Sequence, residues 1–146
     1  MHFFTIASLL AATVSGAACG AKKSDEPAAP TFDVENFKAF CLPHGGACYY
    51  VFEVYKHRSG EDIPTECNTS VRGDGSLPSI NDGQCNSSRT FDVIRNEDGS
   101  LNFSVTQQVT PISFTTSNHT IPADQIEVQD GQEVYVGPTS FGLYGY

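Results

Sequence analysis

The hydrophobic and polar residues from Phe32 onward alternate with a period of two, and this alternation predicts β-strands. It is clean over residues 101–109, where Leu101, Phe103 and Val105 are expected to face a core while polar residues between them face solvent. The chain is therefore expected to fold mainly through the pairing of strands.

Several other segments share this strand signature. Residues 48–56, CYYVFEVYK, have aromatic and β-branched side chains on both faces, so we expect a central strand there. Residues 90–95 precede the turn-forming sequence NEDGS and are expected to pair with the strand that follows it. Residues 111–117 and 138–146 supply two further candidate strands.

Turn signals separate these segments. Asp130-Gly131 lies between two short alternating runs and predicts a hairpin closed by a two-residue type I′ turn. Residues 63–88 are rich in glycine, proline, asparagine and serine, so we interpret them as loops fixed by cysteines. The one segment with helical spacing is 34–40, VENFKAF, which is too short to assign.

About seven to nine short strands with closely spaced turn signals are typical of a sandwich or a closed antiparallel barrel. The length beyond the leader suits one hydrophobic core. The fold class we expect is all-β: a single-domain antiparallel β-barrel or sandwich over residues 32–146, stabilised by two disulfides.

The first 18 residues, MHFFTIASLLAATVSGAA, form an apolar run that ends in small residues and precedes a charged stretch. This pattern is typical of a secretory signal peptide, whose core is shorter than the ~20 apolar residues that span a bilayer. We expect a signal peptide at 1–18, or at 1–21 if cleavage follows Ala21, and a secreted, extracellular protein. Residues 22–31 mix charges, alanine and proline, and are expected to form a disordered arm.

The cysteines fit an oxidising compartment. Cleavage after Ala18 keeps Cys19 as an odd thiol, whereas cleavage after Ala21 leaves four cysteines, an even number suited to two disulfides. Four cysteines allow three connectivities, and the sequence alone does not choose among them. We favour the two pairs that each close a short loop rich in turn residues, which are Cys41–Cys48 and Cys67–Cys85.

These cysteines are interpreted as structural. The chain has no CxxC motif, and the spacings match no structural zinc site, so we expect no metal and no cofactor. Lipidation of Cys19, as in a bacterial lipoprotein, is disfavoured because the leader has no basic N-terminal region.

The charge balance excludes some partners. Eight Lys and Arg against 17 Asp and Glu give a net charge of −9, and a surface of this sign repels nucleic-acid phosphates. No second long apolar stretch follows the leader, so we expect no nucleic-acid partner and no membrane insertion.

Two surface motifs stand out. Four N-x-S/T sequons exceed the number expected by chance, and we expect at least two to carry glycans. Asn102 is expected on the solvent face of its strand, and the remaining sequons are expected in loops, at Asn68, Asn86 and Asn118. The triplet Arg72-Gly73-Asp74 spells an integrin-type adhesion motif, but we interpret it as ordinary turn chemistry.

The signal for catalysis is weak. An acid-base nuclease needs His and Glu partners with an Arg that holds phosphate. The residues that supply these types are His57, Glu53, Glu61, Arg89 and His119. His44 is interpreted as a loop residue, and we expect neither a catalytic nor a metal site.

Several short pieces of the chain resemble one group of secreted proteins. The pieces are FDVENFKAFCLPHGGACYYVFEV, IPTEC, SLPSINDGQC and VYVGPTSFGL, which lie between Phe32 and Leu143. They resemble small proteins of filamentous fungi described as hypersensitive-response-inducing elicitors and grouped with the Alternaria major-allergen-like proteins.

The resemblance implies an antiparallel β-barrel, export to the host interface, and recognition by plants that triggers defence and local cell death. It also implies that the four cysteines beyond the leader form the family's disulfide framework. Other positions resemble structural residues of the family, and these are Pro43-His44 and Gly137-Pro138 with Phe141. The chain differs from the allergen in cysteine placement and has no Trp, so the allergen's dimer and ligand are not transferred.

We therefore expect a non-enzymatic elicitor or effector, a monomer or weak dimer. It would present loops around residues 57–90 to a host surface protein or a cell-wall component. Two alternatives stay open. One is a small extracellular hydrolase such as a nuclease, and the other is a barrel that holds a small apolar ligand among its ten Phe and six Tyr.

Overall fold

A computed structural model describes residues 27–44 and 46–145 of the chain. The signal peptide, Cys19 and the first part of the predicted arm lie outside the described residues. One short 3-10 turn, Ala123–Gln125, interrupts a series of strands. The strands are β1 (Phe32–Cys41), β2 (Ala47–Lys56), β3 (Thr65–Arg72), β4 (Ile80–Gln84), β5 (Arg89–Arg95), β6 (Leu101–Thr110), β7 (Ser113–Ile121), β8 (Ile126–Gln129), β9 (Gln132–Tyr135) and β10 (Phe141–Gly145).

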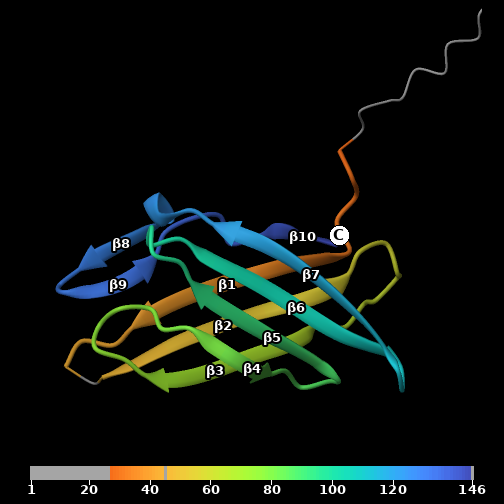
Figure 1. Ribbon diagram of the computed structural model, residues 1–146, viewed down its shortest axis with the longest axis horizontal. Coiled ribbons are helices and arrows are strands. Elements are labelled where there is room, and N and C mark those ends of the chain that lie inside the picture. Colours follow the sequence, from red (N-terminus) through yellow and green to blue (C-terminus); the bar gives the residue numbers. More distant parts are fainter. Residues whose placement is uncertain (1–26, 45, 146) are drawn as a thin grey trace, which may run out of the picture.

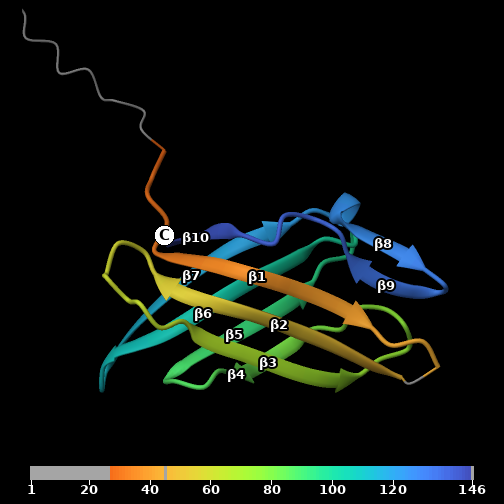
Figure 2. The same cartoon turned by 180° about the vertical axis from the view of Figure 1, so that it is seen from behind.

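The strands form one antiparallel sheet that curls into a nearly closed barrel (Figures 1 and 2). Their order is β3-β2-β1-β10-β7-β6-β5-β4, and the β8–β9 hairpin joins β1 through the pair Phe40–Val134. The all-β antiparallel fold with two disulfides is therefore confirmed, and so are both predicted disulfide pairs.

The two end strands of the sheet, β3 and β4, meet at a seam. Cys67 and Cys85 face each other across it as an isolated antiparallel bridge and are joined by a disulfide. Beside them, the Asn86 N–H donates to the Glu66 carbonyl at 2.8 Å, and the Glu66 N–H donates to Asn86 Oδ1 at 3.1 Å. The disulfide and these hydrogen bonds join what would otherwise be two open edges.

Aromatic rings fill the barrel. Phe52 and Phe103 pack edge to face with centroids 4.9 Å apart, and Phe91 contacts both rings. Phe37 meets Phe103 at 5.4 Å in the same cluster. Edge-to-face contacts at this spacing are those that aromatic cores favour, so the rings form the core of the barrel.

β1 corrects the helical signal of residues 34–40, which form a strand. A β-bulge between Glu35 and Lys38 shifts the register by one residue. The bulge places Val34 and Phe37, three residues apart, on the same buried face. That spacing imitates one turn of a helix, whereas it arises from an irregular strand.

The reading of residues 63–88 as loops is also wrong, because this segment contains β3 and β4. Only Thr65 and Cys67 of β3 are buried, and the polar side chains along the strand face solvent. In β4, a Cβ at Gly83 would lie 2.5 Å from the ring of Phe91. The glycine that suggested a loop is thus required for close strand packing.

Other local predictions are confirmed. β5 and β6 pair across the NEDGS turn, and β2 is a central strand between β1 and β3. Asp130 and Gly131 close the β8–β9 hairpin with φ values of 52° and 76°, as a type I′ turn requires. Within the predicted arm, the Thr31 N–H donates to the Leu143 carbonyl at 2.7 Å.

Two arginines lie at the ends of the inward face of β5. The buried Arg89 donates to Glu61 Oε1 at 2.7 Å and to the Val54 carbonyl at 3.1 Å. At the other end, Arg95 binds both carboxylate oxygens of Glu133 at 2.6 and 2.8 Å. Each pair ties β5 to elements across the barrel, so the barrel is fastened at both ends.

We predict that the seam disulfide is the more stabilising of the two. Replacing both Cys67 and Cys85, 18 residues apart, with Ala should lower the free energy of unfolding by about 3 kcal/mol, measured by urea unfolding. The matched control is the double replacement of Cys41 and Cys48. Their separation is 7 residues, and the loss should be about 2 kcal/mol. A larger loss in the control would contradict the role given to the seam.

We predict that Glu133 makes the fold acid-sensitive. The Arg95 hydrogen bonds lower the pKa of Glu133, against an opposing effect of burial. Its contribution to stability is present above its ordinary value of 4.5 and is lost as the pH falls below that value. Glu133→Gln should cost about 1.5–3 kcal/mol at neutral pH, and the cost should decrease as the pH falls below ~4.5. The free energy of unfolding is measured by urea unfolding at neutral and at acid pH. An equal loss in Glu133→Gln at both pH values would refute this prediction.

Candidate functional site

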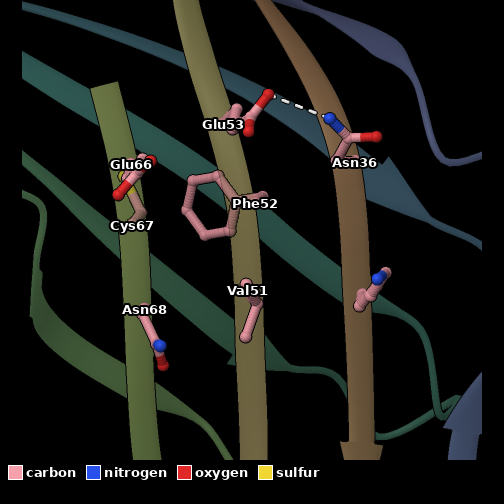
Figure 3. A pocket seen from close by; sticks show the side chains of 8 residues that line it. Asn36, Val51, Phe52, Glu53, Glu66, Cys67 and Asn68 are labelled. Atoms are coloured by element: carbon pink, nitrogen blue, oxygen red, sulfur yellow. Dashed lines mark hydrogen bonds between the residues drawn. The ribbon is translucent and has the colours of Figure 1, made fainter. Parts of the chain in front are cut away.

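The outer face of β1, β2 and β3 carries a shallow depression of about 340 Å³ (Figure 3). Its floor contains Phe52 and Cys67, which are each 1% exposed because their side chains point into the core. Polar groups surround the floor. The residues that line the depression are Asn36, Lys38, Val51, Phe52, Glu53, Glu66, Cys67 and Asn68.

The β1 bulge shapes one wall of this depression. Asn36 lies in the bulge with a φ of 53°, in the left-handed region that asparagine tolerates better than most residues. Its side-chain amide donates to Glu53 Oε2 at 2.9 Å, a contact drawn in Figure 3. A bulge re-aims side chains, and here it brings an amide from β1 against a carboxylate of β2.

Three glutamates form a row across this face. Glu35 pairs with Glu53 in the β1–β2 register, and Glu53 pairs with Glu66 in the β2–β3 register. Like charges directly opposite one another are unfavourable in a sheet. Partial desolvation, together with the carboxylates of Glu35 and Glu53, raises the pKa of the nearby Tyr55.

The depression therefore offers carboxylate and amide oxygens as hydrogen-bond acceptors, with the Lys38 ammonium and the amides as donors. This chemistry suits polar, hydroxyl-rich or cationic groups. Within the described residues, no group of three or more His, Cys, Asp or Glu side chains is arranged to hold a metal ion.

Of the candidate catalytic residues, the structure brings Glu61 and Arg89 together. Arg89 is 2% exposed and also donates to Thr65 Oγ1 at 2.7 Å. Burial raises the pKa of Glu61, but hydrogen bonds from the Lys56 N–H and from Arg89 outweigh it and the net pKa is lowered. Arg89 is thus committed to acceptors within the protein.

The histidines have separate surroundings. His57 Nδ1 lies 2.6 Å from Asp33 Oδ2, after the end of β2. His119, on β7, stacks on Phe141 with ring centroids 4.4 Å apart. Exposed His44 lies in the β1–β2 turn with a φ of 60°, in agreement with its interpretation as a loop residue.

The sequons are exposed or partly exposed, and three of them lie in strands. Asn102 is on the solvent face of β6, as expected, and Asn86 is in the loop after β4. The expectation that Asn68 and Asn118 lie in loops is wrong, because they lie on β3 and β7. Strands with a polar outer face resemble loops in composition, which accounts for the error. Glycosylation of all four stays a prediction.

The Arg72-Gly73-Asp74 triplet forms a turn at the end of β3. Gly73 packs so closely on the Cys41–Cys48 disulfide that a Cβ would lie 2.6 Å from Cys48 Sγ. Asp74 Oδ1 accepts the N–H of Ser76 at 3.1 Å, and this hydrogen bond lowers the pKa of Asp74. The Asp74 carboxylate is therefore engaged within its own turn.

Residues singled out by the resemblance have structural contacts. The Tyr135 hydroxyl donates to the Pro138 carbonyl at 2.7 Å, and Phe141 packs on Phe37. Comparisons with protein-family models, curated proteins and solved structures gave no match to this chain. No helix among the described residues is long and apolar enough to cross a membrane.

Sequence reasoning missed the depression, since it did not single out Asn36, Lys38 or Glu66. These residues come from different strands, and their proximity depends on the bulge and on the β2–β3 register. No short sequence motif joins them, so the sequence gives no local signal for the depression.

We predict that His119 makes the fold sensitive to mild acid. Burial lowers its pKa below the ordinary value of 6.5, so its contribution to stability is lost as the pH falls below 6.5. His119→Phe should weaken the dependence of the melting temperature on pH between ~7 and ~5. His44→Asn, at an exposed turn, is the matched control and should leave this dependence intact. An unchanged pH profile in His119→Phe would disprove the assignment.

Proposed function

We propose that this chain is a secreted, non-enzymatic elicitor or effector-like protein that a host recognises through its surface. The main support for this proposal is the contrast between the aromatic side chains of the interior and the polar side chains of the outer surface. Aromatic rings occupy the barrel interior, while carboxylates, amides and an ammonium gather in an open depression on β1–β3. The resemblance to fungal elicitors supports the same role.

The candidate catalytic side chains interact with other residues of the protein, and this also supports recognition over hydrolysis. Arg89 is buried against Glu61, and His119 packs against Phe141. A nuclease would need these groups to converge on a phosphate in an accessible site. Their separate pairings favour structural roles instead.

The depression suggests the kind of partner. Glu66 and Asn68 belong to the segment 57–90 that we expected to face the host, and the seam disulfide holds that segment on the barrel. Adjacent carboxylates and amides suit a hydroxyl-rich wall component or the basic surface of a host protein. Two disulfides fit an extracellular setting.

The test is infiltration of purified protein into leaf tissue. We expect local cell death from the native protein and none from the reduced and alkylated form. Glu53→Gln with Glu66→Gln should require about a tenfold higher dose, equivalent to ~1.4 kcal/mol of lost binding. The control is Glu97→Gln with Glu127→Gln, two exposed glutamates outside the depression, and should act like the native protein.

Two results would overturn the proposal. Absence of any defence response to the native protein would refute the elicitor role. Hydrolysis of RNA that is lost in His57→Ala or His119→Ala would replace it with the nuclease alternative.

A further inference from the structure

The β6–β7 hairpin ends in a tip of exposed apolar side chains. Val109, Ile112 and Phe114 have exposed fractions of 59%, 93% and 62%. Ile112 lies in the turn, and Phe114 pairs with Gln108 across the ribbon. These three side chains are therefore not part of the core, although the rest of β6 supplies some of the most buried residues of the barrel.

Both edges of the tip extend past the neighbouring strands. β5 pairs with β6 only as far as Gln107, and β10 pairs with β7 at Ser117 and Asn118 among the described residues. The tip projects from the barrel in both views (Figures 1 and 2). Among the described residues, no strand pairs with the free side of β7 along residues 113–116, so this edge can accept another strand.

The hairpin is also uncharged. Residues 99–123 contain no Asp, Glu, Lys or Arg, in a chain whose net charge is −9. The polar side chains near the tip are neutral threonines, serines and glutamines. A charged partner segment would lose hydration here and find no opposite charge on the tip, so an uncharged segment suits it better.

A lipid surface and a protein differ in whether they offer hydrogen bonds to the unpaired backbone groups of the tip. Inserting the tip into a bilayer would carry unpaired N–H and C=O groups into a medium that offers them no hydrogen bonds. An extended polypeptide would pair them by strand addition and cover the apolar side chains at the same time. The open edge therefore favours a protein partner.

We propose that the tip binds an extended, uncharged segment of a partner protein, which adds as a strand along residues 113–116 of β7. The added strand packs apolar side chains at alternate positions against Ile112 and Phe114. This goes beyond the proposed function, because it assigns a second contact surface, separate from the depression, and the conformation of the bound segment.

The test uses a phage-displayed library of random octapeptides, selected on the native protein. Selected peptides should be uncharged, with β-branched or aromatic residues at alternate positions. Their affinity should fall at least tenfold for Ile112→Ser with Phe114→Ser, and for the milder Ile112→Thr in the same direction. Val128→Ser, at a 69% exposed residue on β8, is the matched control and should bind as the native protein does.

Hydrogen exchange distinguishes strand addition from simple apolar contact. Bound peptide should slow the exchange of amides in residues 113–116. Peptides that bind the double variant equally well, or that leave this exchange unchanged, would overturn the proposal. So would binding of the native protein to phosphatidylcholine vesicles, or tip-dependent self-association without peptide. None of these outcomes depends on leaf infiltration, so this proposal and the elicitor role fail separately.

Discussion

The closure of the sheet between β3 and β4 is the constraint on which the rest of the structure depends. A curled antiparallel sheet encloses its own core only when its first and last strands meet. Here they meet at the Cys67–Cys85 bridge and the adjoining hydrogen bonds between Glu66 and Asn86. In the closed sheet, the period-two alternation of hydrophobic and polar residues places the phenylalanines inside the barrel and the polar side chains outside.

The charged residues of β5 complete this arrangement. Arg89 and Arg95 project from the same face as the core residues between them, and each finds a carboxylate near one end of the barrel. Arg89 is buried and Arg95 is partly buried, and a cation in such a position is tolerated when it is paired and hydrogen-bonded, as both are here. The interior is therefore packed with rings and bounded by ion pairs.

Local signals in the sequence were sufficient for much of the fold. The alternation of β6 and the Asp130-Gly131 turn could be predicted because both depend on neighbours in the chain. The bulge at Asn36 could not, since a strand with one extra residue shows the spacing of a helix. β3 and β4 were mistaken for loops because one face of each is polar. The depression could not be predicted from the sequence, because it depends on the register of three strands.

The lack of lysine and arginine in the β6–β7 hairpin continues to the end of the sequence, and it has a consequence for susceptibility to proteases. No Lys or Arg follows Arg95 in the sequence, so an enzyme of trypsin specificity has no cleavage site beyond that residue. Arg95 itself is held by Glu133. Digestion by such enzymes is thereby confined to the N-terminal part of the chain, and residues 96–146 stay in one piece even when earlier loops are cut.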